Sequence, residues 1–538
     1  MDTSRLLRTS GTLVAAAALL ISAAVTGSAA PGGTGPDRPR GGLLGPVDDT
    51  GGSDAAPPPL APLPTALPAA LRPYYDQKLR WHACSGKRSG FECATMRAPL
   101  DYGAPRDGDV KLAVSRKKAT GSGKRLGALM VNPGGPGGSA VGFLQQYAAS
   151  RYPAPVRARY DMVAMDPRGV AASDPVTCLS DQEMDAYARV DQTPDSAAEV
   201  RDLVNAYKKF AAGCAARSGK LLRHVSTIEA ARDMDIFRAV LGDDKLHYVG
   251  ASYGTFLGAT YAGLYPKRVG KLVLDGALDP SLSAEQINHD QTVGFQTAFA
   301  SFVEDCAGHE NCPLGSSRTD VANSRLKSFF EQLDDRPLPT GTSRELTESL
   351  ATTGVISAMY DEGSWPVLRK ALQNAQSGDG SLLLRLSDAY YERDERGAYT
   401  NLMPANSAVN CLDLPTAFHG PAGVYRALPD FEKASPALGT SFAWGALTCA
   451  YWPVPATGTP HRIPASGAAP ILVVGTTRDP ATPYRWAGAL ASQLSSGRLL
   501  TYDGDGHTAY TRGSSCVDGA VNTYLLTSAS PPASQKCA

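Results

Sequence analysis

The pentapeptide Gly250-Ala-Ser-Tyr-Gly254 decides the fold of this chain because of the segments on either side of it. Residues 245–249 form a short apolar run typical of a buried strand, and residues 255–264 are typical of a tightly packed helix. A serine in such a turn has a strained backbone, and the flanking glycines avoid collisions with the neighbouring strand and helix. A Gly-x-Ser-x-Gly turn in this setting predicts that Ser252 is a nucleophile.

Strand-like apolar runs alternate with helical segments on both sides of this turn. The expected strands are residues 91–96, 110–115, 126–131, 160–165, 245–249 and 271–275, with a helix over residues 228–241. The first two read as an antiparallel pair joined through residues 100–105. The later repetition of strand and helix predicts a mostly parallel sheet with helices on both faces.

The alternation stops between residues 281 and 465, where helical patterns cover residues 292–306, 321–333 and 345–360. Strands return at residues 470–475 and 498–503, with a helix over residues 484–494 between them. The pattern predicts an α/β-hydrolase fold in two parts, residues 73–280 and 466–538, interrupted by a mainly helical cap over residues 281–465.

The amino-terminal region is expected to lie outside this fold. Residues 1–30 read as a signal peptide, with Arg5 and Arg8 before an apolar run at residues 13–25 and small residues at 27–30. The run is shorter than the ~20 residues of a membrane span, so we expect a secreted, extracellular protein without a membrane anchor after cleavage. Residues 31–72 are rich in Pro, Gly and Ala and carry few large apolar side chains, which predicts a spacer or a pro-segment.

The charge and the cysteine content of the chain bear on its binding partners and on its disulfides. The 52 basic and 52 acidic residues balance to zero net charge, which gives no basis for binding nucleic acid. Ten cysteines in a secreted chain are expected to form disulfides. The simplest framework pairs sequence neighbours: Cys84 with Cys93, Cys178 with Cys214, Cys306 with Cys312, Cys411 with Cys449, and Cys516 with Cys537. Without a Cys-x-x-Cys pair or a histidine cluster, we expect neither a metal nor another cofactor.

A serine nucleophile needs a base to take its proton and an acid to orient that base. In α/β-hydrolases these residues follow in the order serine, acid, histidine. Asp479 lies just after the returning strand, and His507 lies in the glycine-flanked loop Tyr502-Asp-Gly-Asp-Gly-His507. Of the eight histidines, only His507 has both the order and the loop position. Asp275 is the main rival for the acid; its alternative role is to hold a loop by binding backbone N–H groups.

A glycine-rich loop at residues 131–139 follows another expected strand. Its backbone N–H groups, with that of Tyr253, are placed to bind the oxyanion of a tetrahedral intermediate. A dinucleotide-binding turn is the alternative, but two prolines remove N–H groups that a phosphate would need. Arg168, after the next strand, either binds a substrate carboxylate or forms a structural ion pair, and the ion pair is favoured.

These motifs together resemble the secreted tripeptidyl aminopeptidases, which belong with the prolyl aminopeptidase-like serine hydrolases. The matching stretches are Asn132-Pro-Gly-Gly-Pro-Gly137, Asp166-Pro-Arg-Gly169, Gly250-Ala-Ser-Tyr-Gly-Thr255, Arg478-Asp-Pro-Ala-Thr-Pro483, Gly506-His-Thr-Ala-Tyr510, Asn410-Cys-Leu-Asp413 and Cys449-Ala-Tyr-Trp-Pro453. The resemblance implies Ser252 as nucleophile, Asp479 as acid and His507 as base. It also implies that Gly135 and Tyr253 supply the oxyanion N–H groups.

The resemblance implies a serine exopeptidase that releases short peptides, tripeptides in this family, from free amino termini. Many prolyl aminopeptidase relatives begin the glycine-rich loop with His-Gly-Gly-Pro, whereas this chain has Asn132 followed by proline, which favours the tripeptidyl branch. A cap carboxylate is expected to pair with the substrate ammonium. Glu304 and Asp413 are the candidates carried forward, with Asp361 and Glu362 behind them. A carboxylesterase and a single-residue prolyl aminopeptidase remain the alternatives, and nothing in the sequence indicates an oligomeric state.

Overall fold

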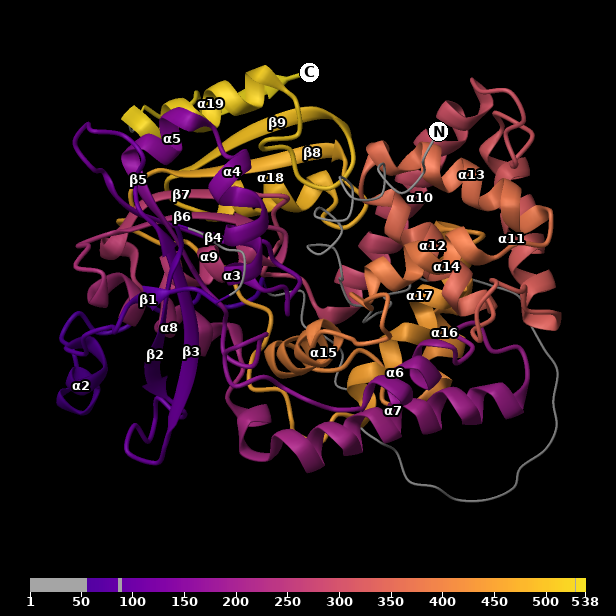
Figure 1. Ribbon diagram of the computed structural model, residues 1–538, viewed down its shortest axis with the longest axis horizontal. Helices are drawn as coiled ribbons and strands as arrows, with labels where there is room; N and C mark the ends of the chain where they lie inside the picture. Colours follow the sequence, from indigo (N-terminus) through magenta and orange to yellow (C-terminus); the bar gives the residue numbers. More distant parts are fainter. Residues whose placement is uncertain (1–55, 86–89, 528) are drawn as a thin grey trace, which may run out of the picture.

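The structure is a computed structural model that describes residues 56–85, 90–527 and 529–538. The expected signal peptide and residues 31–55 of the expected spacer lie outside the described residues. Within them, a ten-stranded sheet stands beside a body of helices (Figure 1).

The sheet has the strand order β1-β2-β3-β5-β4-β6-β7-β8-β9-β10 within the described residues. Its strands are β1 (His82–Ala83), β2 (Glu92–Pro99), β3 (Asp109–Lys117), β4 (Gly127–Asn132), β5 (Tyr160–Met165), β6 (Leu246–Ala251), β7 (Val269–Asp275), β8 (Ile471–Arg478), β9 (Gly497–Asp505) and β10 (Ser534–Cys537). The strands from β1 to β5 in this order pair antiparallel, and all later pairs are parallel. The predicted α/β fold with a mostly parallel sheet is confirmed.

Side chains alternate between two buried layers along the central strands. Leu272 and Leu274 of β7 face one layer and Val273 faces the other, and β8 repeats the pattern. The first layer packs under α8 (Thr227–Val240), α9 (Tyr253–Leu264) and α18 (Tyr484–Gln493). The second packs under α3 (Ala140–Phe143), α5 (Ala154–Arg159) and α19 (Ser515–Thr527). Helices therefore cover both faces, as predicted.

The helical body has a buried cluster of its own. It is built from α10 (Ala284–Ala307), α11 (Thr319–Asp335), α12 (Glu348–Met359), α13 (Trp365–Gln376), α14 (Ser381–Tyr390), α16 (Pro421–Ala434) and α17 (Gly439–Gly445), while α15 (Leu402–Asp413) packs against the sheet side. Helix α10 begins at Ala284, eight residues before the predicted start, and the side chain of the preceding Ser283 forms a capping box with Gln286. That signal was present in the sequence.

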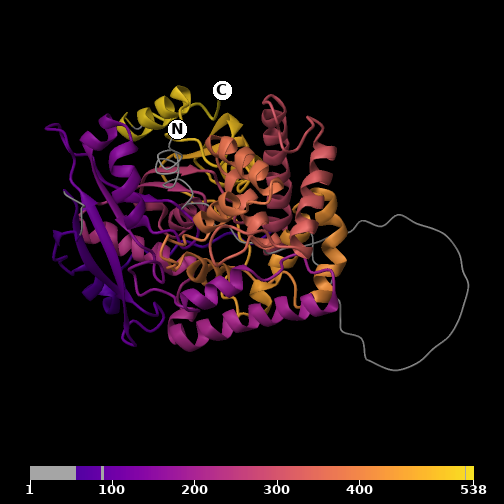
Figure 2. The ribbon, with the colours of Figure 1, turned by 45° about the vertical axis from the view of Figure 1, so that its right-hand side comes forward.

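The helical body also takes in a segment that precedes the serine turn. Between β5 and β6 the chain forms α6 (Asp181–Ala188) and the long α7 (Ala197–Ser218). Leu203 and Tyr207 of α7 are buried in the helical cluster. Figures 1 and 2 show α7 running along one edge of the helical body. The helical layer is thus not limited to residues 281–465.

The described part of the expected spacer is packed against the sheet layer, contrary to expectation. The backbone N–H of Leu60 donates to the carbonyl oxygen of Arg462 at 2.7 Å, and that of Leu63 donates to Leu264 at 2.9 Å. Leu71 is buried, and it leads into the short helix α2 (Arg72–Tyr75). The leucines between the prolines supply the apolar contacts that composition alone underestimates.

All five neighbour-with-neighbour disulfides are present, as predicted. Two of them hold edge strands that the sequence did not predict: Cys84–Cys93 lies beside β1, and Cys516–Cys537 ties β10 to α19. Among the described residues, no helix is both long and apolar enough to cross a membrane.

Candidate active site

Ser252 lies in the turn between β6 and α9 with backbone angles φ 57° and ψ −128°. Side chains at the flanking positions have no room, because a Cβ on Gly250 would lie 2.3 Å from the carbonyl oxygen of Gly254. The N–H of Ser252 donates to the carbonyl oxygen of Asp275 at 2.9 Å, which ties the turn to the next strand. The strained serine turn expected from the sequence is therefore present.

Asp479 and His507 meet at the carboxyl ends of β8 and β9. Nδ1 of His507 lies 2.8 and 2.9 Å from the two carboxylate oxygens of Asp479. The same carboxylate accepts hydrogen bonds from the N–H groups of Ala481, Thr482 and Thr508, at 2.9 to 3.1 Å. With its carboxylate held by these backbone donors and turned to Nδ1, Asp479 is suited to orient His507 and to stabilise an imidazolium.

The side chains of Ser252 and His507, the candidate nucleophile and base, are both buried. Ser252 is fully buried, and His507 is 5% exposed. Neither the Ser252 Oγ nor the His507 Nε2 has a hydrogen-bond partner within the described part of the chain. With Nδ1 turned to Asp479, Nε2 is the nitrogen left to take a proton. The hydrogen bond between base and nucleophile is often formed only when substrate binds.

Asp275, the rival for the acid, holds the histidine loop by its backbone. Its carboxylate accepts hydrogen bonds from the N–H groups of Ala509 and Tyr510 at 2.9 to 3.1 Å. Burial raises the pKa of Asp275 to about 6, against the opposing effect of these hydrogen bonds. The alternative role of Asp275, binding backbone N–H groups, is confirmed. The imidazole of His507 bonds to Asp479 instead.

The glycine-rich loop after β4 lies directly against the serine turn. A Cβ on Gly134 would lie 2.5 Å from the carbonyl oxygen of Ala251 and 3.0 Å from the nitrogen of Tyr253. The N–H of Gly134 is already bound to the side chain of Asn132 at 2.8 Å, so it is not available to a substrate. The loop therefore packs against Ser252 and Tyr253 at Gly134, the residue just before Gly135.

Helix α15 holds this loop from the cap side, a contact that the sequence did not reveal. Nδ2 of Asn406 donates to the carbonyl oxygen of Pro136 at 2.9 Å. A Cβ on Gly137 would lie 2.5 Å from the carbonyl oxygen of Leu402, so the helix and the loop are in close contact. No local pattern announces a contact between residues 270 positions apart.

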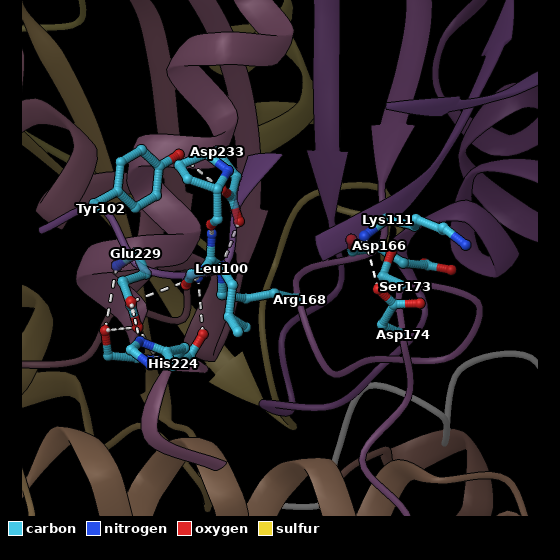
Figure 3. Close-up of polar contacts among 12 residues, drawn as sticks. Leu100, Tyr102, Lys111, Asp166, Arg168, Ser173, Asp174, His224, Glu229 and Asp233 are labelled. Carbon is cyan, nitrogen blue, oxygen red and sulfur yellow. Dashed lines mark hydrogen bonds and ion pairs between the residues drawn. The ribbon is translucent and has the colours of Figure 1, made fainter. Parts of the chain in front are cut away.

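Figure 3 shows Arg168 beside Leu100, His224 and Asp233, with which it forms polar contacts. The guanidinium is fully buried and forms two hydrogen bonds of 2.7 Å with Asp233 of α8. It also donates to the carbonyl oxygens of Pro99, Leu100 and His224. The favoured interpretation as a structural ion pair is confirmed, since this side chain is not exposed to a substrate.

The two cap acids carried forward from the sequence lie in different places. Glu304 is exposed on α10, about 15 Å along the helix from Gly294, which packs against the loop of Asp479. Glu304 is thus not brought to the reacting atoms. Asp413 is buried behind the serine turn: it accepts from the hydroxyl of Thr227 at 2.5 Å, and that hydroxyl lies 2.5 Å from the hydroxyl of Tyr253. Burial raises the pKa of Asp413 to about 7.

A strained serine turn with a histidine–aspartate pair on this sheet is typical of a serine hydrolase of the α/β-hydrolase fold. Residues 435–537 match the family model described as TAP-like protein. The chain is 38% identical to serine protease Hip1 of Mycobacterium tuberculosis, over 86% of this chain and 92% of that protein. It is 32% identical to the tripeptidyl aminopeptidase of Streptomyces coelicolor, over 83% of each chain. The chain belongs to this family of tripeptidyl aminopeptidase-like serine hydrolases.

A third relative carries a different name. Carboxylesterase B of Mycobacterium tuberculosis is 40% identical, over 91% of this chain and 96% of that protein. Among solved structures, the proline iminopeptidase of Mycobacterium smegmatis matches 80% of this chain and 97% of its own, with 14% identity and a TM-score of 0.32.

Proposed function

We propose that this protein is a secreted serine exopeptidase that releases tripeptides from the free amino termini of peptides. Ser252 is the nucleophile, His507 the base and Asp479 the acid. The observation that carries the proposal is the bond from His507 Nδ1 to Asp479, formed beside a strained serine turn whose Oγ has no other partner in the described chain. The relatives named as peptidases support peptide bonds as the target.

The reaction follows from these positions. His507 Nε2 takes the proton of Ser252 as the Oγ attacks the scissile carbonyl, and the N–H groups of Gly135 and Tyr253 bind the oxyanion. His507 then gives the proton to the leaving nitrogen, the C–N bond breaks, and the tripeptide stays as an ester on Ser252. Water, deprotonated by His507, cleaves that ester and restores the serine.

Amino-terminal recognition is assigned to Asp413 rather than to Glu304. Asp413 is buried, and no cation pairs with it among the salt bridges of the described residues. Burial raises the pKa of Asp413 to about 7, and a substrate ammonium would stabilise its ionised form strongly because little water screens the pair. Peptides with acetylated amino termini should therefore be cut far more slowly than free ones. Equal rates would remove this part of the proposal.

The first test is a product ladder by mass spectrometry. The mature protein is incubated with an unblocked peptide of about ten residues, beside a Ser252→Ala control of the same preparation. Successive loss of three-residue units from the amino end, absent in the control, supports the proposal. Loss of single residues indicates a prolyl aminopeptidase instead.

A carboxylesterase is the second candidate, favoured by the relative with that name. Ser252-dependent hydrolysis of a p-nitrophenyl ester, with the decapeptide left intact, would establish it. Secretion is tested separately: expression of the whole chain in a secreting bacterial host should yield a supernatant protein whose amino terminus lies near residue 30. Five disulfides are in keeping with an oxidising compartment.

A further inference from the structure

A pocket walled by aromatic rings adjoins His507 on one side of the serine turn. Its walls include five rings, from Phe143, Tyr147, Tyr152, Tyr360 and Tyr510. Pro133 of the glycine-rich loop and Ala251, the neighbour of Ser252, also line it. The pocket therefore opens where the scissile bond of a substrate would lie.

The rings are held in place by contacts with one another. Tyr152 packs edge-on against Tyr510, with ring centroids 5.2 Å apart, and Phe143 stacks with Tyr147 at 5.4 Å. The hydroxyl of Tyr147 lies 3.0 Å from that of Thr511 in the histidine loop. Tyr152 and Tyr510 are buried, whereas Phe143 and Tyr147 are half-buried. The pocket thus has a fixed floor and an apolar rim that a ligand can cover.

The charges in the pocket wall are already satisfied. Arg512 donates to Asp361 at 2.9 Å and to the carbonyl oxygen of His507 at 2.9 Å. Asp275 is bound by two backbone N–H groups of the histidine loop. No unpaired cation is therefore offered to an anion by the described residues of this wall. The lining favours an aliphatic or aromatic side chain, and burial near Asp275 disfavours an acidic one.

The position of the pocket decides which part of the substrate it takes. His507 gives its proton to the leaving nitrogen, so that nitrogen must lie beside the imidazole. The pocket is lined by His507 together with Thr508, Tyr510, Thr511 and Arg512 of the same loop. The side chain nearest to this wall is the one attached next to the leaving nitrogen.

We propose that this pocket binds the side chain of the residue that becomes the new amino terminus of the shortened peptide, and that it selects apolar residues there. This inference rests on the proposed function, since it takes Ser252 to form an acyl-enzyme and His507 to serve the leaving group.

Capture of the acyl-enzyme by added amines isolates this pocket from the rest of the substrate. The enzyme is acylated with trialanine methyl ester, and glycine amide, phenylalanine amide or aspartic acid α-amide is added. Each amine attacks the ester on Ser252, forms a tetrapeptide amide and restores the serine, in competition with water. The ratio of tetrapeptide amide to free trialanine measures how well the pocket binds each side chain.

Phenylalanine amide should capture the acyl-enzyme at least tenfold better than glycine amide, and aspartic acid α-amide should be the poorest. Phe143→Ala should bring phenylalanine amide to within about twofold of glycine amide, and Phe143→Leu should retain most of the preference. Tyr425→Ala is the matched control, because Tyr425 is an exposed ring on α16. In the Tyr425→Ala control the rate of methyl ester hydrolysis without amine should stay the same.

Equal capture of phenylalanine and glycine amides by the unaltered enzyme overturns the inference, and so does a preference that survives Phe143→Ala. If Phe143→Ala slows ester hydrolysis and leaves the capture ratio unchanged, the pocket holds the acyl chain and the inference is wrong. If the ester is not hydrolysed through Ser252 at all, the proposed function fails first and the inference falls with it.

Discussion

Asn406 in α15 donates a hydrogen bond of 2.9 Å to the carbonyl oxygen of Pro136, so the cap holds the glycine-rich loop directly. Both residues are buried. The loop carries Gly135, and a displacement of about 1 Å in a catalytic group can cost roughly a hundredfold in rate. The cap is therefore coupled to the loop that carries the proposed oxyanion donor Gly135.

Asn406→Leu should lower kcat for a tripeptidyl anilide by roughly tenfold to a hundredfold, because Pro136 loses its partner and the loop is free to shift. KM should change little. Asn288→Leu is the matched control: Asn288 of α10 is also fully buried, and its amide donates to the carbonyl oxygen of Phe442 instead of the glycine-rich loop. A loss of kcat in both variants would indicate general damage to the helical body rather than a role for the loop contact.

Changing Asp479 or Asp275, the two carboxylates near His507, to asparagine should have very different effects on kcat. Asp479→Asn offers Nδ1 a neutral partner that stabilises the wrong tautomer, so kcat should fall by about 10⁴-fold. Asp275→Asn keeps the ring contact and weakens only the hold on Ala509 and Tyr510, so a fall of about tenfold is expected. Steady-state kinetics of both variants at one pH decides the assignment. The reverse order would make Asp275 the acid.

Glu348 at the start of α12 should make stability depend on pH. Its pKa is raised from 4.5 to about 7, first by burial and then by the nearby Asp191, Asp334 and Glu331, despite a hydrogen bond from Thr193. Because the folded protein holds this proton more tightly than the unfolded chain, Glu348 favours folding below about pH 4.5, and this contribution is lost as the pH rises through about 7.

Glu348→Gln should therefore leave the melting temperature almost unchanged at pH 5 and raise it at pH 8. At pH 8 the free energy of unfolding should increase by about 1–2 kcal/mol after allowance for solvent screening. Asp320→Asn, at an exposed site on α11, is the control. Thermal unfolding at the two pH values gives the comparison. A stabilisation equal at both pH values would show that the effect does not come from ionisation.

The disulfide between Cys516 and Cys537 should contribute to the stability of the sheet edge and have little effect on kcat. It spans 21 residues and holds β10, which lies at the edge of the described sheet and pairs there with β9. Replacing both cysteines with alanine should cost about 2–4 kcal/mol of stability while kcat stays within about twofold. The same change at Cys411 and Cys449 should lower kcat as well, because Cys411 lies in α15 close to Asn406. Melting curves and rates measured on both double variants separate the two effects.

The serine turn and the loops of Asp479 and His507, which the structure brings together, have strong local patterns in the sequence. The serine turn needs small residues on both sides, and the loops of Asp479 and His507 follow apolar runs that read as strands at any reasonable boundary. The strands that were missed, β1 and β10, are short and lack such runs, since pairing and a disulfide hold them at the edges.

Contacts between residues far apart in the chain could not be predicted from local sequence patterns. Asn406 reaches Pro136 across 270 residues, and α7 joins the helical body from a segment assigned to the sheet part. The exposed position of Glu304 follows from helical spacing in the sequence. Phe299, Phe302 and Cys306 mark the buried face of α10, and Glu304 lies off that face. The helical periodicity of the apolar residues therefore predicts that Glu304 is exposed to solvent.

Arg168 offers the clearest separation of a structural role from a substrate role. Its guanidinium is fully buried and bonded to Asp233 and three backbone carbonyls, so Arg168→Met leaves a buried carboxylate without its partner. Loss of one member of such a pair costs about 3–5 kcal/mol, and the variant should melt at a much lower temperature. Adding Asp233→Leu should recover part of the loss, because two apolar groups can replace a buried pair. A substrate-binding arginine would behave differently: the single variant would keep its melting temperature and raise KM, and the second change would rescue nothing.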